Sequence, residues 1–231
     1  MTRTGAFTRE QLRSPFTLLL LVGVPAGFVA AAAGVLSDFA TALGGSLAGD
    51  AASALSAGWA AAFIAGTLGF FAASSAKGAD RRLALAGLGA GRVALARISS
   101  SFGIALLAAG AGFVALELVT GVAHPAHAAA AVLAFALVYL GIGVVIGSLV
   151  NGALEGSLAV AVIFLLDVFS GPGMSEQAAP WSVSRWAADV LIAAGVGQQS
   201  SARDWAEAAF VAALALFAAF ATFVWSARSR V

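Results

Sequence analysis

Few residues of this chain could carry out catalysis or bind a metal. The sequence of 231 residues contains no cysteine and two histidines, His124 and His127. The lack of cysteine excludes disulfides, thiol catalysis and cysteine-based zinc or iron–sulfur sites. The two histidines could supply two metal ligands, but no carboxylate or third ligand lies near them in sequence. We therefore interpret them as part of a short solvated turn, and we expect no metal site and no catalytic residue.

Nucleotide chemistry is also weakly represented. No segment has the Gly-x-x-x-x-Gly-Lys-Ser/Thr spacing that cradles phosphates, so any ATP would be handled by another chain. Gly87, Gly89 and Gly91 resemble a dinucleotide-binding turn, but they follow no predicted strand and lack the third glycine at the required spacing. We interpret them as a flexible or closely packed helix end. A formal net charge of +1 without a dense basic patch argues against nucleic-acid binding.

Three carboxylates fall within or at the ends of long apolar stretches: Glu117, Asp167 and Glu207. Carboxylates at membrane depth are costly and usually face a cavity or a partner. One interpretation is that these acids reach the headgroup region or pair with Arg203 or Arg185. The other is that they line the outer part of a substrate pathway and attract cations into it. The sequence leaves both interpretations open.

The elements that must position these groups are hydrophobic helices. Hydrophobic residues make up 61% of the chain and charged residues 10%, against roughly 25% charged in soluble domains, so lipid must be its main solvent. The apolar runs are continuous, which favours helices over the alternating strands of a β-barrel. We expect an all-α, polytopic protein with a single transmembrane domain over residues 1–231. Its six predicted spans cover roughly residues 16–37, 53–75, 101–120, 127–150, 154–171 and 205–226.

The basic residues predict the orientation of these spans. With the N-terminus inside, Arg185 and Arg203 are the exceptions among 12 Lys and Arg residues, and the others lie on the cytoplasmic side. Four of the tryptophans then fall near the outer interface, and Trp225 falls near the inner one, where amphipathic rings are most stable. We therefore expect both termini to be cytoplasmic.

Two connections are long enough to contain helices of their own. The cytoplasmic connection, residues 77–99, has a basic first half followed by leucines among small residues, which suggests a short helix across the membrane base. The external connection, residues 172–203, has apolar residues at helical spacing and predicts an amphipathic helix too short to cross. Its Arg185 and Asp189 are four residues apart and would lie together on the polar side. A further short helix is expected along the inner membrane surface at residues 7–14.

Small residues recur within the predicted spans and indicate close helix packing. The spacing Gly143-x-x-x-Gly147 is the sharpest case, because it lets two helix backbones approach closely. We favour packing within the chain over a dimer face for these residues. The other positions are Gly66, Gly69, Gly110, Gly112 and Gly141.

The layout resembles the permease subunit of bacterial ATP-binding-cassette exporters of the second export family, which includes drug and antibiotic exporters. Four features carry the likeness. The first is the segment Leu12 to Pro15 before a Leu-rich span that contains Pro25. The second is residues 79–92, in the place of that family's coupling helix between spans two and three. The third is the end of the fifth span at residues 169–172, and the fourth is residues 181–195, in the place of a short external helical hairpin.

The resemblance implies an assembly of two permease subunits, identical or related, with two cytosolic ATPase subunits that bind ATP and magnesium. It implies that the permease exports an amphipathic or hydrophobic substrate, such as a drug, an antibiotic or a lipid-like molecule, across the bacterial cell membrane. It also implies coupling contacts in residues 79–92, although family members often have a Glu-rich, Thr-containing start and a proline there, which this chain lacks. The expected coupling residues are Asp80, Arg81, Arg82, Leu83, Leu85 and Leu88, and those of the external hairpin are Trp186 and Val190.

Other classes of protein remain as alternatives. An ATP-independent transporter or channel is the main one, but it would be expected to show paired charged or helix-breaking residues near mid-membrane. A membrane enzyme lacks a base or metal cluster at membrane depth. An assembly or immunity subunit completes the set.

Overall fold

The computed structural model describes residues 23–47, 49–83, 86–87, 89–174 and 181–228. Within these residues every regular element is a helix, and six of the helices are long and apolar enough to cross a membrane. The chain is therefore a multi-pass, all-helical membrane protein, as the sequence predicts. The helices are α3 (Val24–Ala42), α4 (Gly49–Leu83), α5 (Ala90–Val119), α6 (Pro125–Leu149), α7 (Ala153–Ser170), α8 (Arg185–Gly195) and α9 (Ala202–Arg228).

Helices form here because lipid cannot satisfy backbone polar groups, so each span must bond them internally. Each predicted span overlaps a helix of the structure, but α3 runs to Ala42 instead of ending near residue 37. Helix α4 runs to Leu83 instead of ending near residue 75, and α5 begins at Ala90 instead of near residue 101. Pro25 and Pro125 stand in the first turns of α3 and α6, where the missing N–H breaks no helical bond. The predicted surface helix at residues 7–14 lies outside the described residues.

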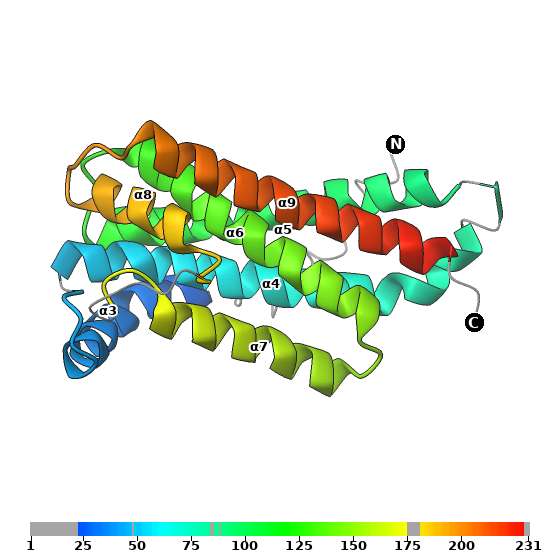
Figure 1. Ribbon diagram of the computed structural model, residues 1–231, viewed down its shortest axis with the longest axis horizontal. Helices are drawn as coiled ribbons and strands as arrows, with labels where there is room; N and C mark the ends of the chain where they lie inside the picture. The colour runs from blue at the N-terminus through cyan, green and yellow to red at the C-terminus, as the bar shows by residue number, and fades with distance from the viewer. Residues whose placement is uncertain (1–22, 48, 84–85, 88, 175–180, 229–231) are drawn as a thin grey trace.

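The centre of the bundle is the contact between α4 and α6 (Figure 1). Gly143 of α6 lies against the backbone of Gly66 and Phe70 on α4. One turn further on, Gly147 lies against the Phe70 carbonyl, and a Cβ at Gly69 would come within 2.9 Å of the Leu140 carbonyl. These glycines therefore pack within the chain, as predicted.

The remaining spans surround this pair. The most apolar window of α4 is 78% buried, whereas the corresponding windows of α3, α5, α7 and α9 are 22–33% buried. Their outward faces carry large apolar side chains, such as Leu118, Leu154 and Phe217. Such faces suit contact with lipid chains. The short helix α8 packs on α4, α6 and α9 at one end of the bundle.

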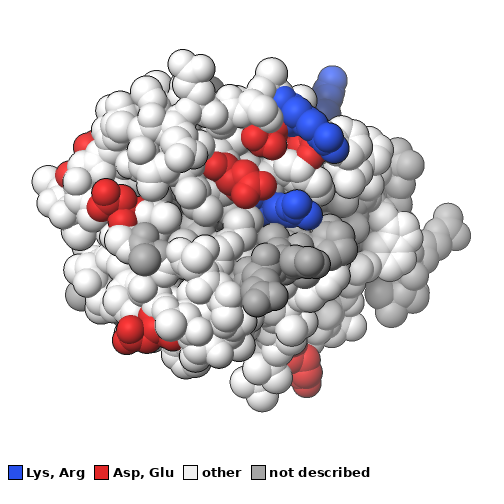
Figure 2. Space-filling view, turned by 60° about the vertical axis from the view of Figure 1, so that its left-hand side comes forward, with Lys and Arg blue, Asp and Glu red and all other residues white. Residues whose placement is uncertain are grey.

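The two ends of the bundle differ in charge. We call the end with the start of α4 and the end of α5 the acidic end. Its charged side chains are Asp38, Asp50, Glu117, Asp167, Arg185, Asp189, Arg203, Asp204 and Glu207. Figure 2 looks toward this end and shows acidic groups spread over it, with basic groups beside some of them. The opposite, basic end holds Lys77, Asp80, Arg82, Arg92, Arg97 and Glu155.

The connection at the basic end differs from the prediction. Residues 79–83 continue α4, and residues 90–92 begin α5, so the described residues contain no separate helix across the membrane base. Between the two helices, Gly87 and Gly89 have φ values of 94° and 74°, which favour glycine over other residues. The two spans therefore extend as a helical hairpin.

Replacing Gly143 by alanine should destabilise the protein. The added Cβ would collide with the backbone carbonyl of Gly66, which cannot move without separating α4 from α6. We expect a loss of about 1–3 kcal/mol, typical of overpacking, measured as a lower thermal unfolding midpoint in detergent micelles.

Gly110→Ala is the matched control, because nothing lies within 4 Å of a Cβ at that position. Its unfolding midpoint should stay the same or rise. Equal effects of the two substitutions would show that the α4–α6 contact does not limit stability.

Candidate functional site

The first candidate region is the tip of the α4–α5 hairpin at the basic end. Asp80 of α4 is 6% exposed, and its carboxylate accepts hydrogen bonds from Arg97 Nε of α5 at 2.8 and 3.1 Å. Arg97 Nη2 lies 2.8 Å from Asp80 Oδ1, which completes the ion pair. Asp80 was predicted to contact a partner, but here it joins the two helices of the hairpin.

Other predicted coupling residues are accessible. Arg82 is exposed, and Leu83 is 40% exposed on the last turn of α4. Arg92, on the first turn of α5, is also exposed. Arg81 lies in α4, but its side chain is outside the description, and so are Leu85 and Leu88. The hairpin tip thus presents two cations and an exposed leucine.

Lys77 connects this hairpin to the rest of the basic end. Its Nζ donates to the Val150 carbonyl at 2.8 Å and to Asn151 Oδ1 at 3.1 Å. Val150 is the C-cap of α6, where unpaired carbonyls and the helix dipole favour a cation. A displacement of the hairpin would therefore act on α6 as well as on α4.

The second candidate region surrounds Asp167 at the acidic end. This carboxylate is 3% exposed. Its Oδ2 accepts a hydrogen bond from Tyr139 Oη of α6 at 2.8 Å, and its Oδ1 accepts one from Ser182 Oγ at 2.7 Å. The Ser184 backbone N–H also points to Oδ1, with a donor–acceptor distance of 3.4 Å. We call these four residues the Asp167 node.

The node differs from both interpretations of the sequence. Asp167 forms no ion pair with Arg203 or Arg185 in the described part of the chain, and it faces no water-filled pathway, because protein encloses it. Sequence reasoning missed its partners. Tyr139 is the single tyrosine of the chain, and a phenolic hydroxyl within an apolar span needs a hydrogen-bond partner. That signal could have pointed to it.

The other two predicted acids have separate surroundings. Glu207 pairs with Arg203 across one turn of α9, with Arg203 Nε 2.7 Å from Oε1, as the first interpretation of the sequence expects. Glu117 is partly exposed near the end of α5. The helix that carries it packs on α3, α4, α6 and α9, whereas α7 packs on α4 and α6. The structure therefore gives Glu117, Asp167 and Glu207 no common cluster.

The predicted external helix is α8, although residues 175–180 before it lie outside the described residues. Val190 is fully buried, and Trp186 is partly buried with the Arg185 guanidinium 6.0 Å from its ring centroid. Burial raises the pKa of the Asp189 carboxyl, the charge of Arg185 opposes this rise, and the charge of Asp204 adds to it. The apolar face of α8 is therefore part of the core, and its polar side lies at the acidic end.

The two histidines lie at the rim of the same end. Their ring centroids are 5.7 Å apart, and the His127 ring meets Trp205 of α9 edge to face at 5.5 Å. Within the described residues no group of three or more His, Cys, Asp and Glu side chains could hold a metal ion. His127 thus contributes to the contact between α6 and α9.

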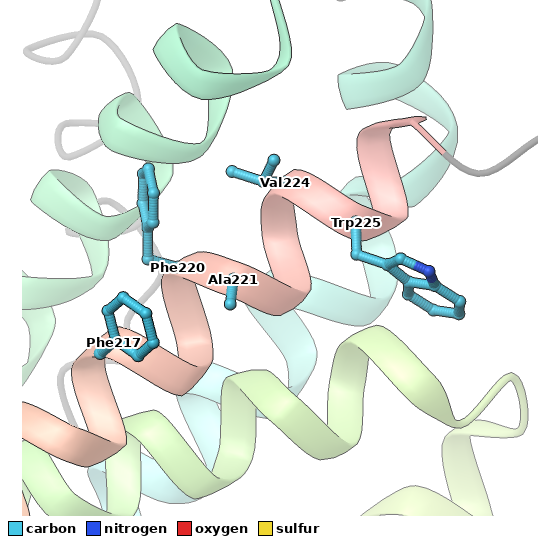
Figure 3. A pocket seen from close by; sticks show the side chains of 5 residues that line it. All are labelled: Phe217, Phe220, Ala221, Val224 and Trp225. Atoms are coloured by element: carbon cyan, nitrogen blue, oxygen red, sulfur yellow. The ribbon is translucent and has the colours of Figure 1, made fainter.

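A shallow groove of about 350 Å³ lies on α9 near the basic end. Figure 3 shows that its lining side chains come from this one helix: Phe217, Phe220, Ala221, Val224 and Trp225. Phe217 and Trp225 are more than half exposed. An open groove whose described lining comes from one helix suits lipid chains better than an enclosed substrate.

Comparisons of the chain with models of protein families, with curated proteins and with solved structures find no match. The function must therefore be argued from the hairpin tip, from the Asp167 node and from the layout of the spans.

Proposed function

We propose that this chain is the membrane-spanning subunit of an ATP-driven exporter, working as a dimer with separate cytosolic ATPase subunits. The observation that carries the proposal is the long α4–α5 hairpin at the basic end. One of its two helices, α4, is the most buried helix of the bundle, and its tip carries exposed cations. Such an element can receive mechanical work from a partner and deliver it to the core.

The lengths of the two helices support this role. Helix α4 has 35 residues and α5 has 30, which correspond to about 50 and 45 Å at 1.5 Å per residue. The hydrocarbon core of a bilayer is about 30 Å thick. Both helices are thus long enough to project from the membrane, and Figure 1 shows the hairpin extending past the end of α6.

The polar ties at the basic end support efficient transmission. The Asp80–Arg97 pair keeps α4 and α5 in register, and Lys77 joins α4 to the end of α6. A push on the hairpin would then move α4, α5 and α6 together. The placement of the basic residues favours a cytoplasmic position for this end, with both termini on the cytoplasmic side of the bacterial cell membrane.

The proposed substrate class is inferred from the surface of the bundle. The described part of the bundle has apolar outer faces and one acidic end. We expect an amphipathic or hydrophobic substrate, and negative potential at the acidic end would favour cationic members of that class. An ATP-independent transporter is the alternative, and export driven by an ion gradient in the absence of ATP would support it.

The orientation can be tested with single cysteines, because the chain has none. Asp50 and Arg82 are exposed at opposite ends. In whole cells an impermeant maleimide should label Asp50→Cys, whereas Arg82→Cys should react only after permeabilisation. The reverse pattern would invert the topology.

Charge reversal at the hairpin tip should uncouple the permease from its ATPase. Arg82→Glu should lower ATP-driven export of a hydrophobic dye from cells by about tenfold, because like charges across an interface cost more than about 1.4 kcal/mol. Copurification of a nucleotide-binding subunit should fall in parallel, with the amount of permease in the membrane unchanged.

Arg82→Lys is the matched control and should retain most export, since it keeps the positive charge. If Arg82→Glu exported dye and retained its ATPase as the original chain does, the hairpin tip would not be the coupling site.

Glu117 is the predicted pathway acid that is partly exposed and forms no salt bridge within the described residues. Glu117→Gln should lower export of cationic dyes several-fold relative to neutral ones, because removing one exposed carboxylate weakens the attraction of cations. Equal losses for both classes of dye, or a loss of membrane protein, would point to a structural role.

A further inference from the structure

Helix α7 is held differently at its two ends. Near the basic end, Gly156 lies directly against the ring of Phe70 on α4. One turn before Asp167, the Phe164 ring packs against Phe63 of α4 and Tyr139 of α6, with centroid distances of 5.1 and 5.8 Å. At the last turn, the Phe169 ring meets Phe39 of α3 edge to face at 5.9 Å. These are apolar contacts without directional bonds, and much of the helix faces outward. Such contacts allow α7 to tilt about the half that lies toward the basic end.

The acidic end of α7 is held by the Asp167 node. In the described part of the chain, the side-chain hydrogen bonds that join α7 to other elements all involve Asp167. Just after the helix, the Gly173 carbonyl accepts backbone hydrogen bonds from Ser46 and Leu47 at 3.1 Å, which join this end to the segment before α4 as a hinge. The hydrogen bonds of Asp167 lead to other parts of the bundle. They reach Tyr139 of α6 and the segment immediately before α8. Since α8 packs on α4, α6 and α9, both attachments lead to the body of the bundle.

A buried carboxylate is an unusual choice for a permanent tie. Its hydrogen bonds are charge-assisted and strong in an apolar interior, but burial also removes hydration that the charge would regain in contact with water. Apolar side chains of similar size would hold two helices together at less cost. Compared with an apolar side chain, the carboxylate therefore lowers the free energy of a state in which α7 is separated from the bundle and water replaces the three protein donors.

Two further buried groups would gain from separation. Ser184 Oγ and Trp59 Nε1 are both enclosed and have no hydrogen-bond partner in the described residues. Trp59 lies beside the end of α7, because a Cβ at Gly171 would be 3.2 Å from Trp59 Cζ2. Water that entered between α7 and the body would satisfy polar groups that now lack partners.

We infer that the Asp167 node is a releasable latch: its hydrogen bonds hold the acidic end of α7 against α6 and the start of α8, and their release opens this end of the bundle. This inference rests on the proposed export function, in which opening of the acidic end releases the substrate. A helix with two discrete arrangements is a common switching element in proteins.

The latch can be tested on the purified chain in nanodiscs, without ATPase or substrate. Ser184→Cys places a thiol at the node, and it removes no side-chain hydrogen bond of the described residues because Ser184 Oγ has no partner among them. The chain has no other cysteine. In this background Asp167→Asn and Tyr139→Phe should each raise the rate of maleimide labelling about tenfold, as expected for the loss of a hydrogen bond to a charged group.

Ser56→Cys is the control position, because Ser56 is equally buried on α4 and its hydroxyl bonds within its own helix. Labelling there should not change with either substitution. Unchanged rates at position 184 would overturn the latch. Equal increases at positions 56 and 184 would also overturn it, since they would indicate general loosening of the bundle.

A second measurement tests whether release of the Asp167 node is required for transport. Cysteines replacing Asp167 and Ser182 can be joined by a short, reducible thiol cross-linker, since the native side chains are within hydrogen-bond distance. Cross-linking should stop dye export from cells and reduction should restore it. Export that continued after complete cross-linking would refute a role in transport. If no form of the chain exported any substrate, the export function would fail, while the labelling rates would still decide whether the latch exists.

Discussion

The direct contact between the backbones of α4 and α6 is the constraint on which the rest of the bundle depends. In a bilayer the hydrophobic effect does not draw helices together, because lipid chains are as apolar as leucine. Close packing must supply the attraction, and glycines such as Gly66 and Gly143 let the two backbones meet. With this pair at the centre, the remaining spans need only one packed face, and their other faces carry the apolar side chains that lipid requires.

Polar side chains then set the positions of the helices relative to this pair. Lys77 joins α4 to the end of α6, and the pair formed by Asp80 and Arg97 joins α4 to α5. At the opposite end, Asp167 joins α7 to α6 and to the segment before α8. The Asp167 carboxylate is enclosed by protein, where a hydrogen bond to a charge is strong and an unpaired charge is costly. The ties at the basic end are more exposed. These hydrogen bonds and ion pairs favour particular arrangements of the helices over intermediate ones.

The two ends therefore differ in mechanical character. At the basic end, polar ties join α4 to α5 and to the end of α6, which suits an element that receives work. At the acidic end, the Asp167 carboxylate joins α7 to α6 and to the segment before α8. The Gly173 carbonyl, just after α7, accepts backbone hydrogen bonds from Ser46 and Leu47, and the ring contacts of Phe164 and Phe169 are apolar. Helix α4 runs between the ends as the most buried element. In the proposed exporter, energy enters at the hairpin tip and the outward opening occurs beside α7.

Local patterns in the sequence determined much of this protein. Six apolar stretches of sufficient length predict six spans, helical spacing predicts α8, and glycine spacing predicts close packing inside the chain. The surroundings of the ionisable groups were decided only by the tertiary structure. Tyr139 and Asp167 are 28 residues apart, and whether that acid meets lipid, water or a hydroxyl depends on how α7 is rotated against its neighbours. Likewise, Asp80 of α4 meets Arg97 of α5, 17 residues later, because these two helices pack side by side. Hydropathy and periodicity predict that a segment is helical and which solvent it contacts. The packing of the whole bundle determines which helix faces contact one another.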